Sequence, residues 1–173
     1  MAELTEEEWE QLFDSQQVNP VQTAEQELVQ RILNVQLQAK IVLELALSKN
    51  NPLVYQKLGE LWVPKLDDFQ RIFKQGSEEA YQKYLELFGD TIPTLSPKNR
   101  HDNIYILASN SLLIEQNVLM PNGYRKIIPN LHEEPIWVGW KYVEGKNRSG
   151  LAYNGLVWVE DHFVWIPKAW RLF

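Results

Sequence analysis

The sequence contains no cysteine among its 173 residues. Disulfide bonds and thiolate metal sites are therefore excluded, and the composition fits a reducing compartment such as the cytoplasm. The acidic N-terminus, MAELTEEEWEQLF, lacks the basic start and apolar run of a secretory signal. The longest apolar region, residues 28–47, is interrupted by Arg31 and Lys40, which makes it a poor candidate for a membrane span. We expect a soluble, cytoplasmic protein.

The motifs of several enzyme classes are missing as well. There is no Gly-x-Ser-x-Gly elbow and no glycine-rich loop ending in Lys-Ser or Lys-Thr. The histidines His101, His132 and His162 each stand beside a carboxylate, but adjacent strand residues point to opposite faces, so this adjacency predicts little. No ligand-spaced pair occurs, and we expect neither a metal nor a cofactor. An enzyme acting on a small anionic substrate near Arg125, His132 and Lys146 remains an alternative.

The net charge of −6 is distributed unevenly along the chain. Residues 1–90 carry 8 Lys and Arg against 16 Asp and Glu, whereas residues 91–173 carry 9 against 7. The first half is therefore acidic and the second is mildly basic. Such an asymmetry is compatible with a partner-binding surface on either half, but solvated helix faces are the better explanation.

Residues 1–90 are predicted to form about five helices joined by short connections. Thr5 and Glu8 have the spacing of a capping box, and Thr23 and Gln26 repeat it. Proline and glycine residues then separate the later segments, as expected at helix starts and ends. The predicted helices cover residues 6–16, 24–49, 53–62, 65–74 and 78–88. Together they should make a helical bundle.

The clearest helix is predicted over residues 24–49, where apolar residues recur at alternating spacings of three and four. Its second half, AKIVLELAL, is apolar nearly all round, which is typical of a central, buried helix. A homodimeric coiled coil is disfavoured because the apolar stripe widens instead of staying a two-position seam. A homo-oligomer is nevertheless left open.

The composition changes from helix to strand after residues 91–102, which hold Pro93 and Pro97 and are the predicted linker. Residues 103–173 contain short β-branched and aromatic runs separated by turn residues, which predicts an antiparallel β-unit, either a small barrel or a twisted sheet. The predicted strands cover residues 104–107, 112–114, 136–143, 156–160 and 163–166, with a hairpin at 118–128 around Pro121-Asn-Gly123. The fold class is therefore α+β, with a helical region at 1–90 packed on a β region at 103–173.

The chain ends with the apolar strand Trp165-Ile-Pro167, a single turn at 168–170 and a short run at 171–173. This ending resembles the close of Src-homology-3-like barrels, which carry a Trp-Ile/Val-Pro strand, a 3₁₀ turn with an aromatic residue and one last strand. The resemblance implies a barrel fold and assigns no binding residues, because fold does not fix function.

Five of the seven tryptophans fall in residues 136–173. Both faces of residues 136–143 are apolar, so the helical region, a partner or a ligand must cover the second face. We expect the helical region to do so, which leaves only the remaining aromatic residues free for function.

We therefore predict a non-enzymatic protein–protein interaction or adaptor module that uses a Trp-rich β face and acidic helices. Single-stranded nucleic acid is an alternative partner, disfavoured because the acidic helical half would repel its backbone. The candidate partner-binding residues are Trp140, Tyr142, Lys146, Arg148 and Trp170.

Overall fold

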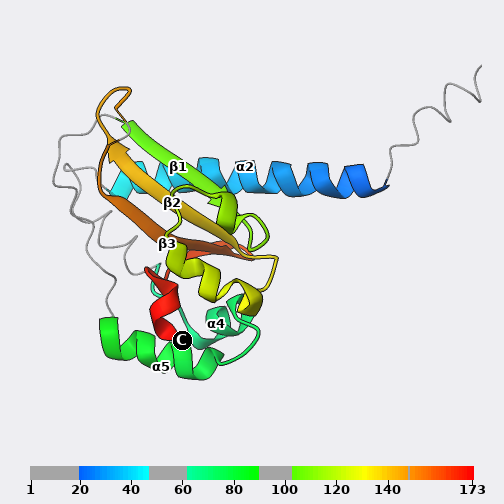
Figure 1. The fold of residues 1–173 in the computed structure, drawn as a ribbon, viewed down its shortest axis with the longest axis vertical. Helices are drawn as coiled ribbons and strands as arrows, with labels where there is room; N and C mark the ends of the chain where they lie inside the picture. Colours follow the sequence, from blue (N-terminus) through cyan, green and yellow to red (C-terminus); the bar gives the residue numbers. More distant parts are fainter. Residues whose placement is uncertain (1–19, 47–61, 90–102, 148) are drawn as a thin grey trace, which may run out of the picture. The chain divides into compact units, whose positions relative to one another are not determined.

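The structure is a computed structural model that describes residues 20–46, 62–89, 103–147 and 149–173 (Figure 1). The chain divides into two units, Met1–Arg31 and Ile32–Phe173, and the arrangement described below is that of the second. The described helices are α2 (Pro20–Ala46), α4 (Leu66–Ile72) and α5 (Ser77–Phe88), and the strands are β1 (Asn103–Ser109), β2 (Ile136–Val143), β3 (Ala152–Val159) and β4 (His162–Trp165). The predicted α+β class is confirmed.

The four strands form one antiparallel sheet in the order β1-β2-β3-β4. Valine, isoleucine, tryptophan and tyrosine dominate them, as expected for residues that fit a pleated and buried surface. Every residue of β2 except Lys141 is buried, so both faces of this central strand are covered. The sheet therefore lies between two layers.

A β-bulge interrupts the pairing of β2 with β3, where the register shifts between Val138 and Trp140. Gly155 lies at the bulge with a φ of +83°, and a Cβ atom added there would lie 2.2 Å from the carbonyl oxygen of Ile166. Both the backbone conformation and the close approach require glycine. The bulge brings the side chain of Asn154 into the interior, where its Oδ1 accepts hydrogen bonds from a tyrosine hydroxyl and a backbone N–H.

One face of the sheet is covered by the part of α2 that follows Arg31 (Figure 1). The backbone N–H of Ala108 donates to Oε1 of Gln36 at 3.0 Å, which satisfies a donor on edge strand β1. The hydroxyl of Tyr142 donates to the carbonyl oxygen of Leu43 at 3.4 Å. The helix side turned to the sheet holds the buried residues Ile32, Val35, Ala39 and Leu43.

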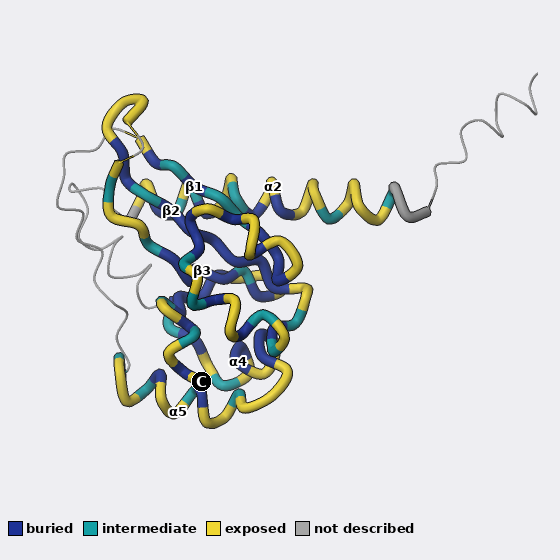
Figure 2. The backbone as a smooth tube through the Cα atoms, in the orientation of Figure 1, coloured by how far each residue is buried: buried dark blue, intermediate teal, exposed yellow. Residues whose placement is uncertain are grey.

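The opposite face packs against α4, α5 and four 3₁₀ turns, and it holds the main core, seen as the buried segments of Figure 2. Trp137 lies at its centre, edge-on to Tyr124 at 5.4 Å between ring centroids and tilted against Phe73 at 6.4 Å. The hydroxyl of Tyr84 on α5 donates to the carbonyl oxygen of Trp165. The 3₁₀ turns are η1 (Ile114–Gln116), η2 (Asn122–Lys126), η3 (Ile128–Asn130) and η4 (Ala169–Leu172).

The predicted five-helix bundle is wrong. The described residues contain three helices. Helices α4 and α5 pack against each other on one face of the sheet, and α2 covers the other face, so the three do not form one bundle. The reason is that a sheet with two apolar faces needs a cover on each. The helices predicted at 65–74 and 78–88 are confirmed, and so is the one predicted at 24–49 as far as residue 46. The predicted helices at 6–16 and 53–62, apart from Trp62, and the linker at 91–102 lie outside the described residues.

Several predicted strands are also wrong. Residues 112–114, the hairpin at 118–128 and the last run at 171–173 form turns and 3₁₀ helices instead. At Gly123 an added Cβ atom would lie 2.4 Å from the indole ring of Trp170, so this glycine makes room for a packed ring instead of a hairpin turn. The described strands form an open sheet, and the barrel implied by the Src-homology-3-like ending is not confirmed.

Candidate functional site

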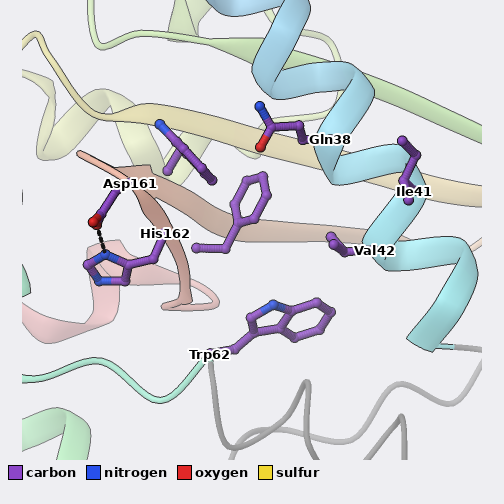
Figure 3. A pocket seen from close by; sticks show the side chains of 8 residues that line it. Gln38, Ile41, Val42, Trp62, Asp161 and His162 are labelled. Carbon is purple, nitrogen blue, oxygen red and sulfur yellow. Dashed lines mark hydrogen bonds and ion pairs between the residues drawn. The ribbon is translucent and has the colours of Figure 1, made fainter.

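An apolar cleft of about 390 Å³ opens beside α2 (Figure 3). Its walls combine aliphatic and aromatic side chains, and its rim carries an amide, a carboxylate and an imidazole. Sites of this composition hold an apolar group and orient it with a few polar contacts. The lining residues are Gln38, Ile41, Val42, Trp62, Trp158, Asp161, His162 and Phe163.

The aromatic wall is fixed by strand pairing. Trp158 and Phe163 face each other across β3 and β4, with ring centroids 4.8 Å apart at an interplanar angle of 70°. Trp62 stands edge-on to Trp165 at 6.2 Å, and its carbonyl oxygen accepts the backbone N–H of Trp165 at 2.8 Å. Such cross-strand and edge-to-face pairs hold their rings in place, so this wall is preformed.

His162 closes one end of the cleft and bonds two carboxylates. Its Nδ1 lies 2.8 Å from Oδ1 of Asp161, and its Nε2 lies 2.7 Å from Oδ1 of the buried Asp68. Burial lowers the pKa of His162, but the hydrogen bonds to Asp161 and Asp68 outweigh it, so the pKa is raised overall. The hydrogen bond from His162 in turn lowers the pKa of exposed Asp161. Because both ring nitrogens lie within hydrogen-bond distance of a carboxyl oxygen, the imidazole of His162 links Asp161 to Asp68.

This clasp joins α4 to the turn between β3 and β4. Oδ2 of Asp68 also accepts the backbone N–H of Lys65 at 2.8 Å, so the same carboxylate caps the start of α4. Beside it, Arg71 pairs with Asp67 at 2.9 Å and with Glu160. We call Asp68, Asp161 and His162 the clasp. Its hydrogen bonds connect α4 to the wall of the cleft.

The outer side of α2 carries an exposed apolar row that runs from the cleft along the helix. Its members follow one another every four residues and are each about half exposed, at 51, 60, 50 and 48%. Side chains four apart in a helix lie above one another, so they form one ridge. We call this ridge the α2 stripe; it consists of Leu33, Leu37, Ile41 and Leu45. Ile41 belongs to both the stripe and the cleft.

The predicted partner-binding residues do not gather on one surface. Trp140 is fully buried and stacked on Tyr153 at 5.5 Å, and Tyr142 is 5% exposed, so both belong to the core. Trp170 is half-buried against Tyr124 at 5.1 Å. Lys146 is exposed in the turn after β2. Arg148 lies outside the described residues.

The residues proposed for an anionic substrate are also kept apart. His132 precedes β2 and Lys146 follows it, so they stand at opposite ends of a strand that spans roughly 23 Å at ~3.3 Å per residue. Arg125 lies in η2, which precedes β2 in the chain, as His132 does. Acid–base chemistry requires groups within about 3 Å of the transferred proton or one water away. These three residues form no such site.

The α2 stripe and the clasp are the features that sequence reasoning missed. The four-residue spacing of Leu33, Leu37, Ile41 and Leu45 is visible in the sequence. It does not stand out there, because the second half of the helix is apolar nearly all round and therefore looks buried on every side. For the clasp no signal exists, because His162 and Asp68 are 94 residues apart.

The protein is thus an α+β domain in which an exposed apolar ridge on α2 lies beside an aromatic cleft. No protein-family model, no curated protein and no solved structure matches the chain. Among the described helices, none is long and apolar enough to cross a membrane. The described residues also contain no group of three or more side chains arranged to hold a metal ion.

Proposed function

We propose that this protein is a non-enzymatic interaction module that binds a helix of a partner protein. The binding surface is the α2 stripe together with the apolar cleft that adjoins it at Ile41. This assignment keeps the function expected from the sequence and moves the surface from the Trp-rich β face to α2, because the tryptophans of β2 are buried.

The observation that carries the proposal is that α2 has two apolar sides. The side with Val35, Ala39 and Leu43 is 0–2% exposed, whereas the opposite side exposes Leu37 to 60%. A surface helix of a complete fold has one apolar stripe and a polar outer face. A contiguous exposed ridge of aliphatic residues marks an interaction site, and helix-in-groove binding reads such a surface through residues three and four apart.

The chemistry of the cleft supports binding over catalysis. Its walls are apolar, and the imidazole at its rim already bonds two carboxylates, so neither ring nitrogen is directed at a substrate. Nucleic-acid binding would require aromatic faces flanked by basic side chains on an accessible strand face. Trp140 and Tyr142 offer no such face because both are buried.

Photo-crosslinking from the stripe tests the proposal. A photoreactive phenylalanine analogue at position 37 should form one discrete adduct in cells that express the full chain. The same analogue at position 87 of α5, where the native leucine is 59% exposed, is the matched control and should form none. Mass spectrometry of the adduct should place the contact on an apolar helical segment. If positions 33, 37 and 41 all fail to crosslink specifically, the stripe is not a docking surface.

A further inference from the structure

The clasp sets two carboxyl groups against a single imidazole ring at the end of the apolar cleft (Figure 3). We propose that a proton on His162 latches the rim of this cleft: the clasp is closed while the proton is bound, and the rim carboxylate of Asp161 is released when the proton is lost. As a control over partner binding the latch rests on the proposed function, whereas its response to protons is a property of the chain alone.

The number of protons in the clasp decides how many of its bonds can form. Nδ1 of His162 lies 2.8 Å from Oδ1 of Asp161, and Nε2 lies 2.7 Å from Oδ1 of Asp68. While both carboxyl groups are ionised they only accept, so each bond requires a hydrogen on the ring nitrogen. A neutral imidazole carries one N–H, and its other nitrogen would set a lone pair against that of a carboxylate oxygen. One of the two bonds must therefore break when the ring becomes neutral.

The bond to Asp161 is the one that should break. The side chain of Asp68 is 7% exposed, and its two oxygens accept from the ring of His162 and from the backbone N–H of Lys65. A buried carboxylate that loses a donor is destabilised far more than an exposed one. The side chain of Asp161 is 89% exposed, so water can replace the imidazole there. The neutral ring should keep its hydrogen on Nε2, and Asp161 should move into water.

The charges around the ring favour the latched form. In the described part of the chain they are Asp67, Asp68 and Arg71 on α4 and Glu160 and Asp161 in the β3–β4 turn, while the α2 residues that line the cleft are uncharged. Four carboxylates against one guanidinium stabilise a positive ring. Burial lowers the pKa of His162, but its two hydrogen bonds outweigh burial and raise the pKa overall. The latch is therefore closed below pH 6.5 and opens as the pH rises through the raised pKa.

The group that the latch releases is part of the cleft. Asp161 and His162 both line it, beside the aromatic pair Trp158 and Phe163. In the latched state the charge of Asp161 is paired with the ring, whereas in the released state it is hydrated. A partner side chain that enters the cleft would then have to displace this water, which costs free energy. Binding should be stronger in the latched state by roughly 2- to 5-fold, as expected for an exposed pair.

Nitrogen-15 NMR of the imidazole rings of the full chain, from about pH 5.5 to 9, tests the latch. The chain has three histidines, and His162→Gln identifies the signals of His162. We expect a protonated ring at the acid end and, above a midpoint higher than 6.5, a neutral ring with its hydrogen on Nε2. A hydrogen on Nδ1, or a ring that does not titrate in this range, would overturn the latch.

Two carboxylate variants separate the clasp from general electrostatics. Asp161→Asn keeps the size of the side chain and removes its charge, so the midpoint of His162 should fall. Asp67→Asn is the matched control, because it makes the same change at a neighbouring carboxylate that pairs with Arg71, and it should shift the midpoint much less. Equal shifts in the two variants would show that the bond to Asp161 has no special role.

Fluorine NMR of the chain labelled with fluorotryptophan shows whether the cleft responds. Trp158 lines the cleft, and its signal, identified with Trp158→Phe, should shift with the same midpoint as His162. Trp137, which is buried in the main core, is the internal control and should not follow this titration. A Trp158 signal that ignores the titration, or that still follows it in His162→Gln, would overturn the link between the clasp and the cleft.

The outcomes separate the latch from the proposed function, because both NMR readouts use the chain alone. If the photoreactive analogue at position 41 forms a discrete adduct, its yield should fall by about 2- to 5-fold from about pH 6 to about pH 8, and His162→Gln should remove this dependence. Equal wild-type yields would overturn the control over binding. If positions 33, 37 and 41 form no adduct, the proposed function fails and the NMR titrations still decide on the latch.

Discussion

Helices α2 and α5 lie on opposite faces of the same sheet and present opposite kinds of surface to solvent. The inner side of α5 buries Ala80 and Tyr84, and that of α2 buries Ala39 and Leu43. Their outer sides differ. Exposed on α5 are mainly charged and amide residues, whereas on α2 they include an unbroken aliphatic ridge. The exposed outer residues of α5 are Glu78, Glu79, Gln82, Lys83, Glu86 and Leu87.

This difference shows which part of the fold is complete in one chain. Helix α5 requires no cover from a partner, because its apolar side is buried within this chain and its polar side is hydrated. Helix α2 covers one face of the sheet but leaves aliphatic side chains exposed to water. Removing this apolar surface from water on association is favourable by about 25 cal/mol per Å². The following experiments test that contrast, from the largest expected effect to the smallest.

The two sides of α2 should respond differently to the same truncation. Leu43→Ala removes a side chain with no exposed surface, so lost burial and the remaining cavity should lower the free energy of unfolding by about 2–5 kcal/mol. Leu37→Ala on the stripe should change it by less than about 0.5 kcal/mol. Urea unfolding at low micromolar concentration measures both. Equal losses would mean that the stripe is covered within the folded chain.

The same Gly→Ala substitution should have different effects on stability at two glycines, because their surroundings differ. Gly155→Ala forces a Cβ atom against a carbonyl oxygen at a φ of +83°, so we expect a loss of about 2–3 kcal/mol. Gly145→Ala also occupies a positive φ, but open space surrounds it, so the loss should be about 1 kcal/mol. Thermal unfolding of both variants compares them. Equal effects would show that backbone conformation, and not the close approach at the bulge, sets the cost.

The clasp should make the α4 layer sensitive to pH, in contrast to α2. Because the folded-state pKa of His162 is raised above 6.5, its contribution is fully present below pH 6.5 and is lost as pH rises through the folded value. With 45% of the side chain exposed, solvent screening limits the contribution to about 0.5–1 kcal/mol. Urea midpoints between pH 6 and 8.5 should fall in the wild type and stay flatter in His162→Gln.

A control substitution distinguishes the clasp from a general effect of losing a histidine. His132→Gln makes the same change at a half-buried histidine outside the clasp and should keep the wild-type slope with pH. If His162→Gln also keeps that slope, the clasp does not contribute to stability in this range.

The smallest effect is expected at the exposed ion pairs next to the clasp. Arg71 is 41% exposed, and its partners Asp67 and Glu160 are 68 and 63% exposed. Pairs of this kind contribute little because water screens them. Arg71→Gln should therefore change the free energy of unfolding by less than about 0.5 kcal/mol, measured by urea unfolding in 0.1 M salt. A larger loss would show that Arg71 supports the clasp.

Much of the fold could be predicted because its signals are local. Capping residues and apolar spacing located α2, α4 and α5, and β-branched runs located the four strands. The turns at 112–128 were misread because apolar residues in 3₁₀ segments mimic short strands, and Asn122-Gly123 mimics a hairpin turn. The candidate site was placed on Trp140 and Tyr142 because a Trp-rich strand looks the same whether its face is covered or open.

By itself the sequence determined where α2, α4, α5 and the four strands lie and which of their sides are apolar, because spacing along the chain fixes side-chain direction within each element. Only the tertiary structure decided which apolar sides are covered. The sheet takes one side of α2 and leaves Leu33, Leu37, Ile41 and Leu45 in water, and the fold brings His162 to Asp68 across 94 residues. Both outcomes depend on contacts between distant residues, which periodicity within one element does not encode.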